Sequence, residues 1–341
     1  MVETLITPEG QVQKGAVTAV LVENKAKLDY PSVSAWLDGK APPPEELARN
    51  PSLLKQVELQ DRLAKSLAAA RKKAGALDID TQETRVVVDK DGKVAALAAS
   101  QQDRAGAIIE ELMIASNTAL ARELDSQGLP SIRRVVKEPE RWARIAAYAG
   151  GLGAALPQTP SSVALSRFTD QMRQQMPQRF AEISLALVKL IGRGEYAAHQ
   201  PGAKEIGHFG LAAEAYAHGT APNRRYVDLV TQRIVKKTHS YSFSELSAIA
   251  AHCTEQEVAA KKVERQVRKV VGALLLRSRI GELFHGIITG AGPKGTFVRI
   301  LEAPVEGKVV QGEKGLQVGD QVRVKLREVF VEKGFIDFQA A

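Results

Sequence analysis

Two adjacent arginines, Arg224 and Arg225, are the residues whose type and position most clearly indicate chemistry. They follow the turn at residues 219–223 within the stretch HFGLAAEAYAHGTAPNRRYVDLVTQRIVKK, residues 208–237. This stretch is typical of a helix, a short turn and a second helix, which places both arginines in the first turn of the second helix. The dipole of a helix disfavours cations at its N-terminus. We therefore expect an anion here, with Arg224 facing a phosphate group.

A second set of polar side chains lies on the helix expected over residues 103–125. Apolar residues cover nearly its whole circumference, so this helix should be buried on most sides. It nevertheless carries Glu110, Glu111 and, seven residues after the first, Asn117. Buried carboxylates need partners. Either they form a structural ion pair, or they belong to a polar wall that lines an internal channel.

Positive charge is concentrated in one part of the chain. The net charge is +8, and residues 224–279 carry 12 Lys and Arg against 5 Asp and Glu, so the remainder is nearly neutral. Such a zone is the electrostatic footprint of a polyanion site, although a solvated helix face has the same composition. Its long helix is expected from a capping box at residues 254–257 to about residue 278, with Glu264 as the lone acid of the basic face.

The spacing of apolar residues and the positions of Gly, Pro and capping residues predict the elements that must position these residues. Along the long helix, the valines and leucine at positions 263, 267, 270 and 274 should face a core. Asn50 and Pro51 are a cap and a first helical residue, and Gly75 ends that helix. The other expected elements are a hairpin with strands at 1–6 and 16–22, a helix at 31–37, a hairpin at 85–88 and 94–98, helices at 142–150 and 176–191, and a polar loop at 192–207.

From about residue 281 the sequence becomes rich in short β-type segments. They lie at residues 283–289, 295–301, 305–310, 321–326 and 335–338, separated by Gly, Pro and Asp turns. About five strands in some 60 residues suit an OB-fold barrel. Phe284, His285, Phe297 and Arg299 would be available for stacking on single-stranded nucleic acid, although each Phe could equally be barrel core. The sequence therefore predicts an α+β fold, with domains at 1–280 and 281–341.

Composition excludes several classes of protein. The 341 residues suffice for two or three domains, and the single cysteine, Cys253, excludes an internal disulfide and suits a reducing cytosol. No apolar run approaches the roughly 20 residues of a membrane span, and the N-terminus lacks the pattern of a signal peptide. A cytoplasmic location without membrane contact is the default expectation.

Several long blocks carry a family resemblance. VENKAKLDYPSVSAWL, RAGAIIEELMIASN, HFGLAAEAYAHGTAPNRRYVDLVTQR and VERQV occur in this order, followed by the expected barrel. With these blocks the chain resembles the ribonuclease II (RNB) family of 3′-to-5′ exoribonucleases over essentially its whole length. The resemblance implies a hydrolase that degrades single-stranded RNA to nucleoside monophosphates with Mg²⁺, acting as a monomer.

The resemblance also assigns roles to residues. Tyr30 looks like the tyrosine that packs on the terminal nucleotides, and Glu110 like the acid that contacts a ribose. Arg224 resembles the arginine that contacts the scissile phosphate, and Glu264 the glutamate near the 3′ end that supports the active centre. Further RNA contacts are expected from three residues: Arg225, Phe284 and Phe297.

The chain also departs from the family pattern. Ile79 stands where an aromatic clamp is common, Gly219 replaces a usual aromatic residue, and Val227 a usual proline. The aspartate cluster that holds magnesium in the family lies ahead of the matching region, so Mg²⁺ is expected for the complete enzyme without ligands from this chain. Asp78 and Asp80 are not expected to substitute for it, and no His or Cys cluster suggests another metal site.

Three functions therefore remain open. The first is the C-terminal part of an exoribonuclease, whose catalytic residues here would be Arg224 and Glu264. The second is a non-catalytic RNA-binding protein, or one part of a split enzyme that needs a complementing N-terminal part. A DNA-binding helix-turn-helix protein is disfavoured, because the second helix carries apolar residues where it would need polar ones to read a groove.

Overall fold

The structure, a computed structural model, describes residues 1–79, 83–91, 94–100, 103–302 and 305–341. They fall into two compact units, each of which is described by itself. The first unit lies within residues 1–80 and 102–255, and the second within residues 81–101 and 256–341. The domain boundary near residue 280 stays a prediction, and the α+β class with a five-stranded barrel is confirmed.

The first unit contains most of the helices, the β1–β2 hairpin and the β5–β6 strand pair. Its elements are β1 (Val2–Ile6), β2 (Val12–Val17), α1 (Tyr30–Leu37), α2 (Glu45–Ala48), α3 (Pro51–Lys73), α4 (Arg104–Ser126), β5 (Ser131–Val135), α5 (Trp142–Gly151), α6 (Ser162–Gln175), α7 (Phe180–Ile191), β6 (Glu195–His199), α8 (Tyr226–Val235) and the start of α9 (Phe243–Leu276). The predicted cap of α3 is confirmed, because the Asn50 side chain accepts a hydrogen bond from the Leu53 N–H at 3.2 Å.

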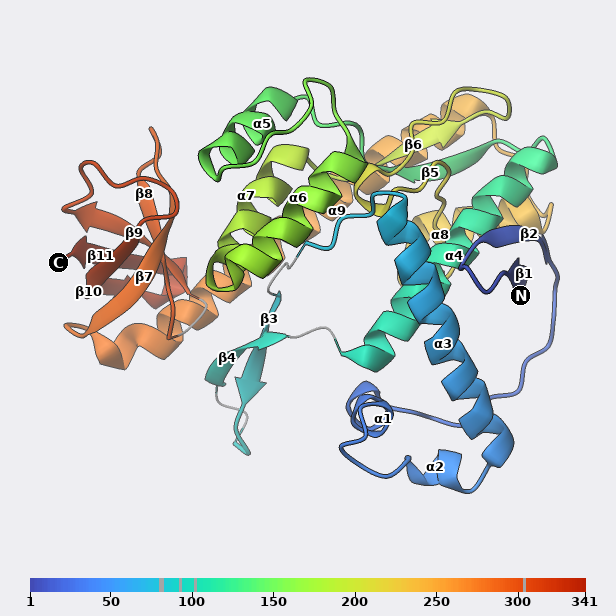
Figure 1. The fold of residues 1–341 in the computed structure, drawn as a ribbon, viewed down its shortest axis with the longest axis horizontal. Coiled ribbons are helices and arrows are strands. Elements are labelled where there is room, and N and C mark those ends of the chain that lie inside the picture. Colours follow the sequence, from blue (N-terminus) through green and yellow to red (C-terminus); the bar gives the residue numbers. More distant parts are fainter. Residues whose placement is uncertain (80–82, 92–93, 101–102, 303–304) are drawn as a thin grey trace. The chain divides into compact units, whose positions relative to one another are not determined.

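Helix α4 is the central element of this unit. It packs against α1, α3, β5 and the β1–β2 hairpin, and α3 runs beside it (Figure 1). Two ion pairs fasten α3 to it, Arg71 with Glu111 and Arg104 with Asp61. The Arg71 Nε–H donates to Glu111 at 2.8 Å. The expected burial of α4 is confirmed, and Glu111 forms the structural ion pair that was one of the two interpretations.

A separate apolar cluster joins α5, α6 and α7. Trp142, Phe168, Met172 and Phe180 are among its buried members. The predicted helix over residues 176–191 begins only at Phe180, after a 3₁₀ turn at Pro177–Arg179. Proline is suited to the first turn of a helix and cannot continue the preceding one, so α6 and α7 are separate helices.

The hairpins differ from expectation in their second strands. Strand β2 ends at Val17 rather than continuing to residue 22, with Val2 opposite Val17. The β3 (Glu83–Val88) and β4 (Val94–Ser100) hairpin is confirmed in the second unit, although residues 92 and 93 of its turn lie outside the described residues.

The loop predicted at residues 192–207 is partly wrong, because β6 pairs there with β5. Strand pairing between distant segments has no local signal in a polar sequence.

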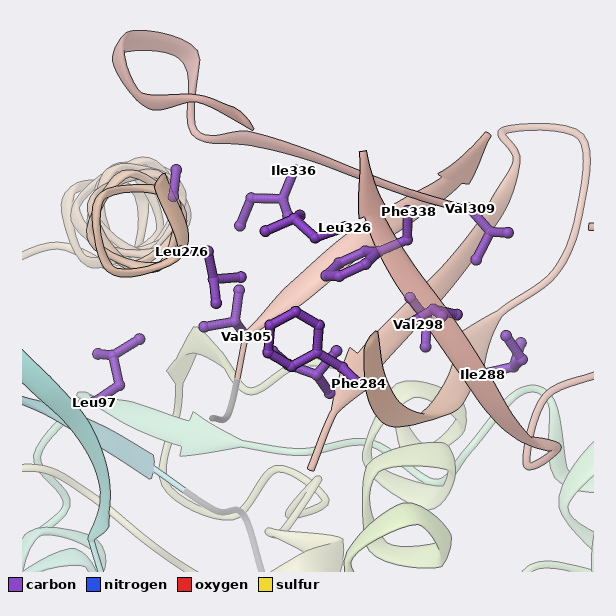
Figure 2. Close-up of a cluster of buried hydrophobic side chains, with 13 residues drawn as sticks. Leu97, Leu276, Phe284, Ile288, Val298, Val305, Val309, Leu326, Ile336 and Phe338 are labelled. Atoms are coloured by element: carbon purple, nitrogen blue, oxygen red, sulfur yellow. The ribbon is translucent and has the colours of Figure 1, made fainter. Parts of the chain in front are cut away.

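The second unit contains the predicted barrel. Its strands are β7 (Leu283–Gly290), β8 (Thr296–Ile300), β9 (Glu306–Gln311), β10 (Gln321–Phe330) and β11 (Phe335–Ala340). They close in the order β10-β11-β9-β8-β7, with only β11 and β9 parallel. Figure 2 shows the core, where the Phe284 and Phe338 rings lie 6.3 Å apart, edge to face.

Helix α9 begins at a different capping box from the predicted one. The Ser242 hydroxyl accepts from the Glu245 N–H at 3.2 Å, and the Glu245 carboxylate accepts from the Ser242 N–H at 2.8 Å. These reciprocal bonds define a capping box. Thr254 instead lies within the helix and donates to the Ala250 carbonyl at 2.9 Å. The pattern occurs twice in the sequence, and the earlier copy starts the helix.

The face that α9 turns to the barrel is also not the predicted one. Val263 and Val267 are 63% and 53% exposed, whereas Ala273 and Leu276 are buried in the barrel core. A Cβ atom at Gly272 would lie 2.9 Å from the Val305 side chain. The helix therefore meets the barrel through the face that carries Gly272, Ala273 and Leu276, where the glycine and the alanine allow a closer approach than the valine stripe would.

Across the described residues, no helix combines the length and apolar character that a membrane span requires.

Candidate nucleic-acid interface

The stretch that precedes Arg224 is an irregular loop. The predicted helix over residues 208–218 is wrong, because only a 3₁₀ turn forms at Phe209–Leu211. Ala212 follows with a left-handed φ of 51°. The Phe209 N–H donates to the Val136 carbonyl at 2.9 Å, and the Arg134 N–H donates to the Tyr216 carbonyl at 2.8 Å. These tertiary hydrogen bonds replace the helical ones.

The buried side chain of Asn117 holds the middle of this loop. Asn117 lies on α4 with no exposed surface. Its Oδ1 accepts from the Gly219 N–H at 3.1 Å, and its Nδ2 donates to the Tyr216 hydroxyl at 3.3 Å and to the Thr220 hydroxyl at 3.4 Å. Its backbone carbonyl accepts from the Ala217 N–H at 3.4 Å. The sequence showed a buried amide, but its partners could not be inferred from spacing.

Helix α8 holds the end of the loop through Asp228. This residue is fully buried, and its carboxylate accepts from the Ala221 N–H and from the Arg225 guanidinium, each at 2.8 Å. The Gln232 side chain donates to the Gly219 carbonyl at 3.1 Å. The loop from residue 217 to 225 is therefore fixed from two helices.

The two arginines differ in what holds them. Arg225 is the residue that precedes α8, with extended backbone angles, and its side chain is in the ion pair with Asp228. Arg224 is exposed, and within the described parts of the chain its side chain has no hydrogen bond or ion pair. The expected position inside the first turn of the helix is wrong for both, because α8 begins at Tyr226. Of the pair, Arg224 is thus the cation without a partner among the residues that the structure describes.

Glu110 lies at a cavity of about 330 Å³ between α3 and α4. The cations on the cavity wall already have partners: Arg71 pairs with Glu111, while Lys65 and Arg104 pair with Asp61. A wall whose charges are neutralised in this way favours an uncharged polar group such as a sugar more than a phosphate.

Tyr30 lies at the first position of α1 and is 51% exposed. The helix is capped by Asp29, whose carboxylate accepts from the Ser32 N–H at 2.9 Å. It is fastened to α4 because the Ser34 hydroxyl accepts from the Ala105 N–H at 3.0 Å. Tyr30, Glu110 and the Arg224 loop are thus all attached to α4.

The remaining predicted contacts lie in the second unit. Glu264 is exposed on α9, in an ion pair with Arg268 one turn later. Phe297 is half-buried on β8. Phe284 is only 1% exposed and packs in the barrel core, which corrects its assignment as an RNA contact, because no ring face is open to a base. His285 is exposed. Arg299 is partly buried, and this burial lowers the pKa of its guanidinium.

One group of possible metal ligands is brought together that was not expected from the sequence. Asp125, His199 and Glu205 place one ligand atom each within 4.8 Å of one another. However, the buried Arg133 guanidinium lies on both carboxylates, 2.7 Å from Asp125 and 3.1 Å from Glu205. A cation already in place, and a histidine nitrogen as one of the three ligand atoms, do not fit Mg²⁺, which prefers oxygen ligands.

The expectation that Asp78 and Asp80 do not hold magnesium stays a prediction. Asp78 forms an ion pair with Arg173 at 2.7 Å, and Asp80 lies outside the described residues. Ile79, at the position of the expected clamp, packs against the cluster of α5, α6 and α7.

His208, at the start of the loop, is held in its neutral form. Burial, reinforced by the positive charge of Arg134, lowers the pKa of His208 to about 4. Its Nδ1 accepts from the Leu211 N–H at 3.2 Å, and its ring lies edge-on to Tyr216 at 5.8 Å. Protonation would remove this acceptor and place a charge under the loop.

Comparison with protein families supplies the context of this geometry. Residues 1–241 match the RNB domain family, and residues 282–341 match the RNase II-type exonuclease C-terminal S1 domain. Ribonuclease R of Aquifex aeolicus is 27% identical over 370 residues, covering 99% of this chain and 51% of that protein. The chain thus spans about half the length of this relative.

Solved structures agree with the fold. The apo form of Mycoplasma genitalium RNase R superposes with a TM-score of 0.85 at 21% identity, covering 99% of this chain and 57% of that one. The same protein in complex with ribose methylated single-stranded RNA gives a TM-score of 0.84 at 22% identity, with coverage of 98% and 56%. At these identities the likeness concerns the fold.

The two neighbouring arginines should respond differently to truncation. Arg225→Ala removes one partner of a buried ion pair and leaves Asp228 uncompensated, so we expect it to destabilise the chain by about 2–4 kcal/mol. Arg224→Ala removes an exposed, unpartnered side chain and should change the free energy of unfolding by less than about 0.5 kcal/mol. Urea unfolding of both variants measures the difference. Equal losses would contradict the distinction drawn between them.

The neutral His208 should make stability depend on pH. Between an unfolded pKa near 6.5 and the folded value of about 4, the unfolded chain binds more protons, so stability rises with pH. The contribution of His208 is complete above pH 6.5 and is lost as the pH falls toward 4. Between pH 7 and pH 5 wild type should therefore lose about 2 kcal/mol more than His208→Gln. Urea unfolding at both pH values tests this, and parallel losses in the two proteins would refute it.

Proposed function

The chain belongs to the RNB domain family, and from this membership we propose that it forms the RNA-binding part of a hydrolytic 3′-to-5′ exoribonuclease. The proposed substrate is single-stranded RNA, and the products of the complete enzyme are nucleoside monophosphates. A chain that spans about half of its relative's length supplies only part of such an enzyme.

The observation that carries this proposal is the state of Arg224. A guanidinium has fixed donors that match phosphate oxygens bidentately. The neighbouring Arg225 is engaged in an ion pair with Asp228, whereas Arg224 is exposed and free among the described residues. Its loop is held rigidly while its donors stay open, as a preorganised phosphate site requires. In phosphoryl transfer such a cation stabilises the charge that develops on the phosphate.

Two further residues complete the proposed contact with the RNA end. The Glu110 carboxylate at its cavity can accept a hydrogen bond from a ribose 2′-hydroxyl, which is the group that distinguishes RNA from DNA. The exposed ring of Tyr30 offers a surface on which a terminal nucleotide can pack. Both roles require that α4 hold the two residues in register.

The second unit would bind the RNA through charge and stacking. Lysines and arginines line α9 around Glu264, which we propose supports the active centre from near the 3′ end. Of the two barrel phenylalanines expected to contact RNA, Phe297 remains available for a base, since Phe284 is core. Arg225 stays a proposed RNA contact only through donors that its ion pair with Asp228 leaves free.

Magnesium is part of the proposal for the complete enzyme. When bound, the metal would activate the attacking water and stabilise the leaving oxygen. The described residues offer no carboxylate group that fits it, because the one cluster of possible ligands is occupied by Arg133. We therefore propose that the ligands come from a segment or chain outside this sequence. The alternative function, a non-catalytic RNA-binding protein, has the same RNA contacts.

RNA binding by the purified chain should be steeply salt-dependent. Each phosphate contact to single-stranded nucleic acid contributes a slope of about −0.7 in log affinity against log salt concentration. Arg224→Ala should make the slope shallower by roughly this amount. Fluorescence anisotropy with a labelled single-stranded RNA at several KCl concentrations measures it. Arg167→Ala, which removes another exposed arginine without a partner among the described residues, is the control. Identical slopes in wild type and Arg224→Ala would contradict the phosphate contact.

The chain by itself should hydrolyse RNA hardly at all. We expect no processive release of mononucleotides when the purified chain is incubated with single-stranded RNA and Mg²⁺, because the metal ligands are proposed to lie elsewhere. Gel electrophoresis of an end-labelled RNA shows the outcome, with a complete ribonuclease R as the positive control. Processive mononucleotide release would refute the proposed location of the metal ligands and the non-catalytic alternative.

A further inference from the structure

We propose that Asn117 is the positioning residue of the phosphate-binding arginine: it fixes the loop that carries Arg224 to the helix that carries Glu110. This inference rests on the proposed function and deepens it. It names the contact that keeps the phosphate donor and the ribose acceptor at a constant separation.

The hydrogen bonds of Asn117 are directed at a single target. Its Oδ1 accepts from Gly219, and its Nδ2 donates to Tyr216 and Thr220. Every hydrogen bond that the structure shows for this side chain therefore goes to the loop. If these hydrogen bonds broke while Asn117 stayed buried, the polar atoms of its amide and those of the loop would lack hydrogen-bond partners, at a cost in free energy.

The path from Asn117 to Arg224 is short and continuous. Thr220 is followed by Ala221, whose N–H is held by Asp228 at 2.8 Å. The Ala221 carbonyl accepts from the Arg224 N–H at 3.2 Å. The Arg224 backbone is thus bonded to the segment 219–221, which Asn117 links to α4 while Asp228 and Gln232 link it to α8.

Helix α4 also fixes the position of Glu110, the proposed ribose acceptor. Glu110 and Asn117 are seven residues apart on α4, or roughly 10 Å along the helix axis at 1.5 Å per residue. Since α4 is capped and buried, this separation is rigid. A nucleotide whose ribose meets Glu110 would therefore find the phosphate donor at a fixed distance.

Gly219 explains how the loop comes so near to α4. A Cβ atom at this position would lie 2.2 Å from the Leu120 Cδ2 atom. Leu120 is itself buried, so it cannot move away freely. Glycine allows the N–H of residue 219 to reach Asn117, and any side chain there would push the loop outward.

The test is a double-mutant cycle on single-stranded RNA affinity, measured with the full chain by fluorescence anisotropy. Asn117→Ala should weaken binding about as much as Arg224→Ala, by about ten-fold or more for a lost charge-assisted contact. The double variant should be no weaker than Arg224→Ala alone, because both changes remove one interaction. Gly219→Ala, which displaces the loop while Asn117 remains, should behave in the same way and serves if Asn117→Ala folds poorly.

A matched control separates positioning from general loss of stability. The Thr169 hydroxyl is also buried and donates to the Ser166 carbonyl at 2.8 Å, within α6. Thr169→Val should lower stability without changing RNA affinity. Wild-type affinity in Asn117→Ala and Gly219→Ala, or losses that add to that of Arg224→Ala, would overturn the positioning role. A wild-type chain that does not bind RNA would instead overturn the proposed function, and this inference with it.

Discussion

The buried amide of Asn117 on α4 is the interaction on which the arrangement of the site depends. A polar group without exposed surface must find hydrogen-bond partners inside the protein, and here they come from a loop about a hundred residues later in the chain. Glu111 follows the same rule on the same helix and finds Arg71 of α3. An otherwise apolar helix thus selects its neighbours through the few polar side chains that it buries.

Elements with a complete local signal were predictable from the sequence. The cap at Asn50 and the proline after it set the start of α3, and the turn residues between short β-type segments set the five barrel strands. In these cases the residues that define an element lie inside it or next to it. Helix α4 was equally clear, because its apolar residues cover nearly the whole circumference.

Elements decided by distant partners were not predictable. Residues 208–218 have a composition that is compatible with a helix, yet their hydrogen bonds go to β5 and to α4. Strand β6 forms because β5 offers it an edge. On α9 the valine stripe has helical spacing, but the barrel selects the face with Gly272 and Ala273 because that face allows closer packing. Spacing shows which residues share a face, but not which face is covered.

The candidate site likewise has a part that the sequence predicts and a part that only the structure shows. Because the two arginines are adjacent, the sequence indicated both. Only the structure separates Arg225, which is held by Asp228, from Arg224, which has no partner among the described residues. The buried carboxylates repeat this pattern, with Asp61, Glu111 and Asp228 each held by an arginine. Asp125 and Glu205 share Arg133. Because these acids are engaged in structure, they are poor ligands for a hard dication.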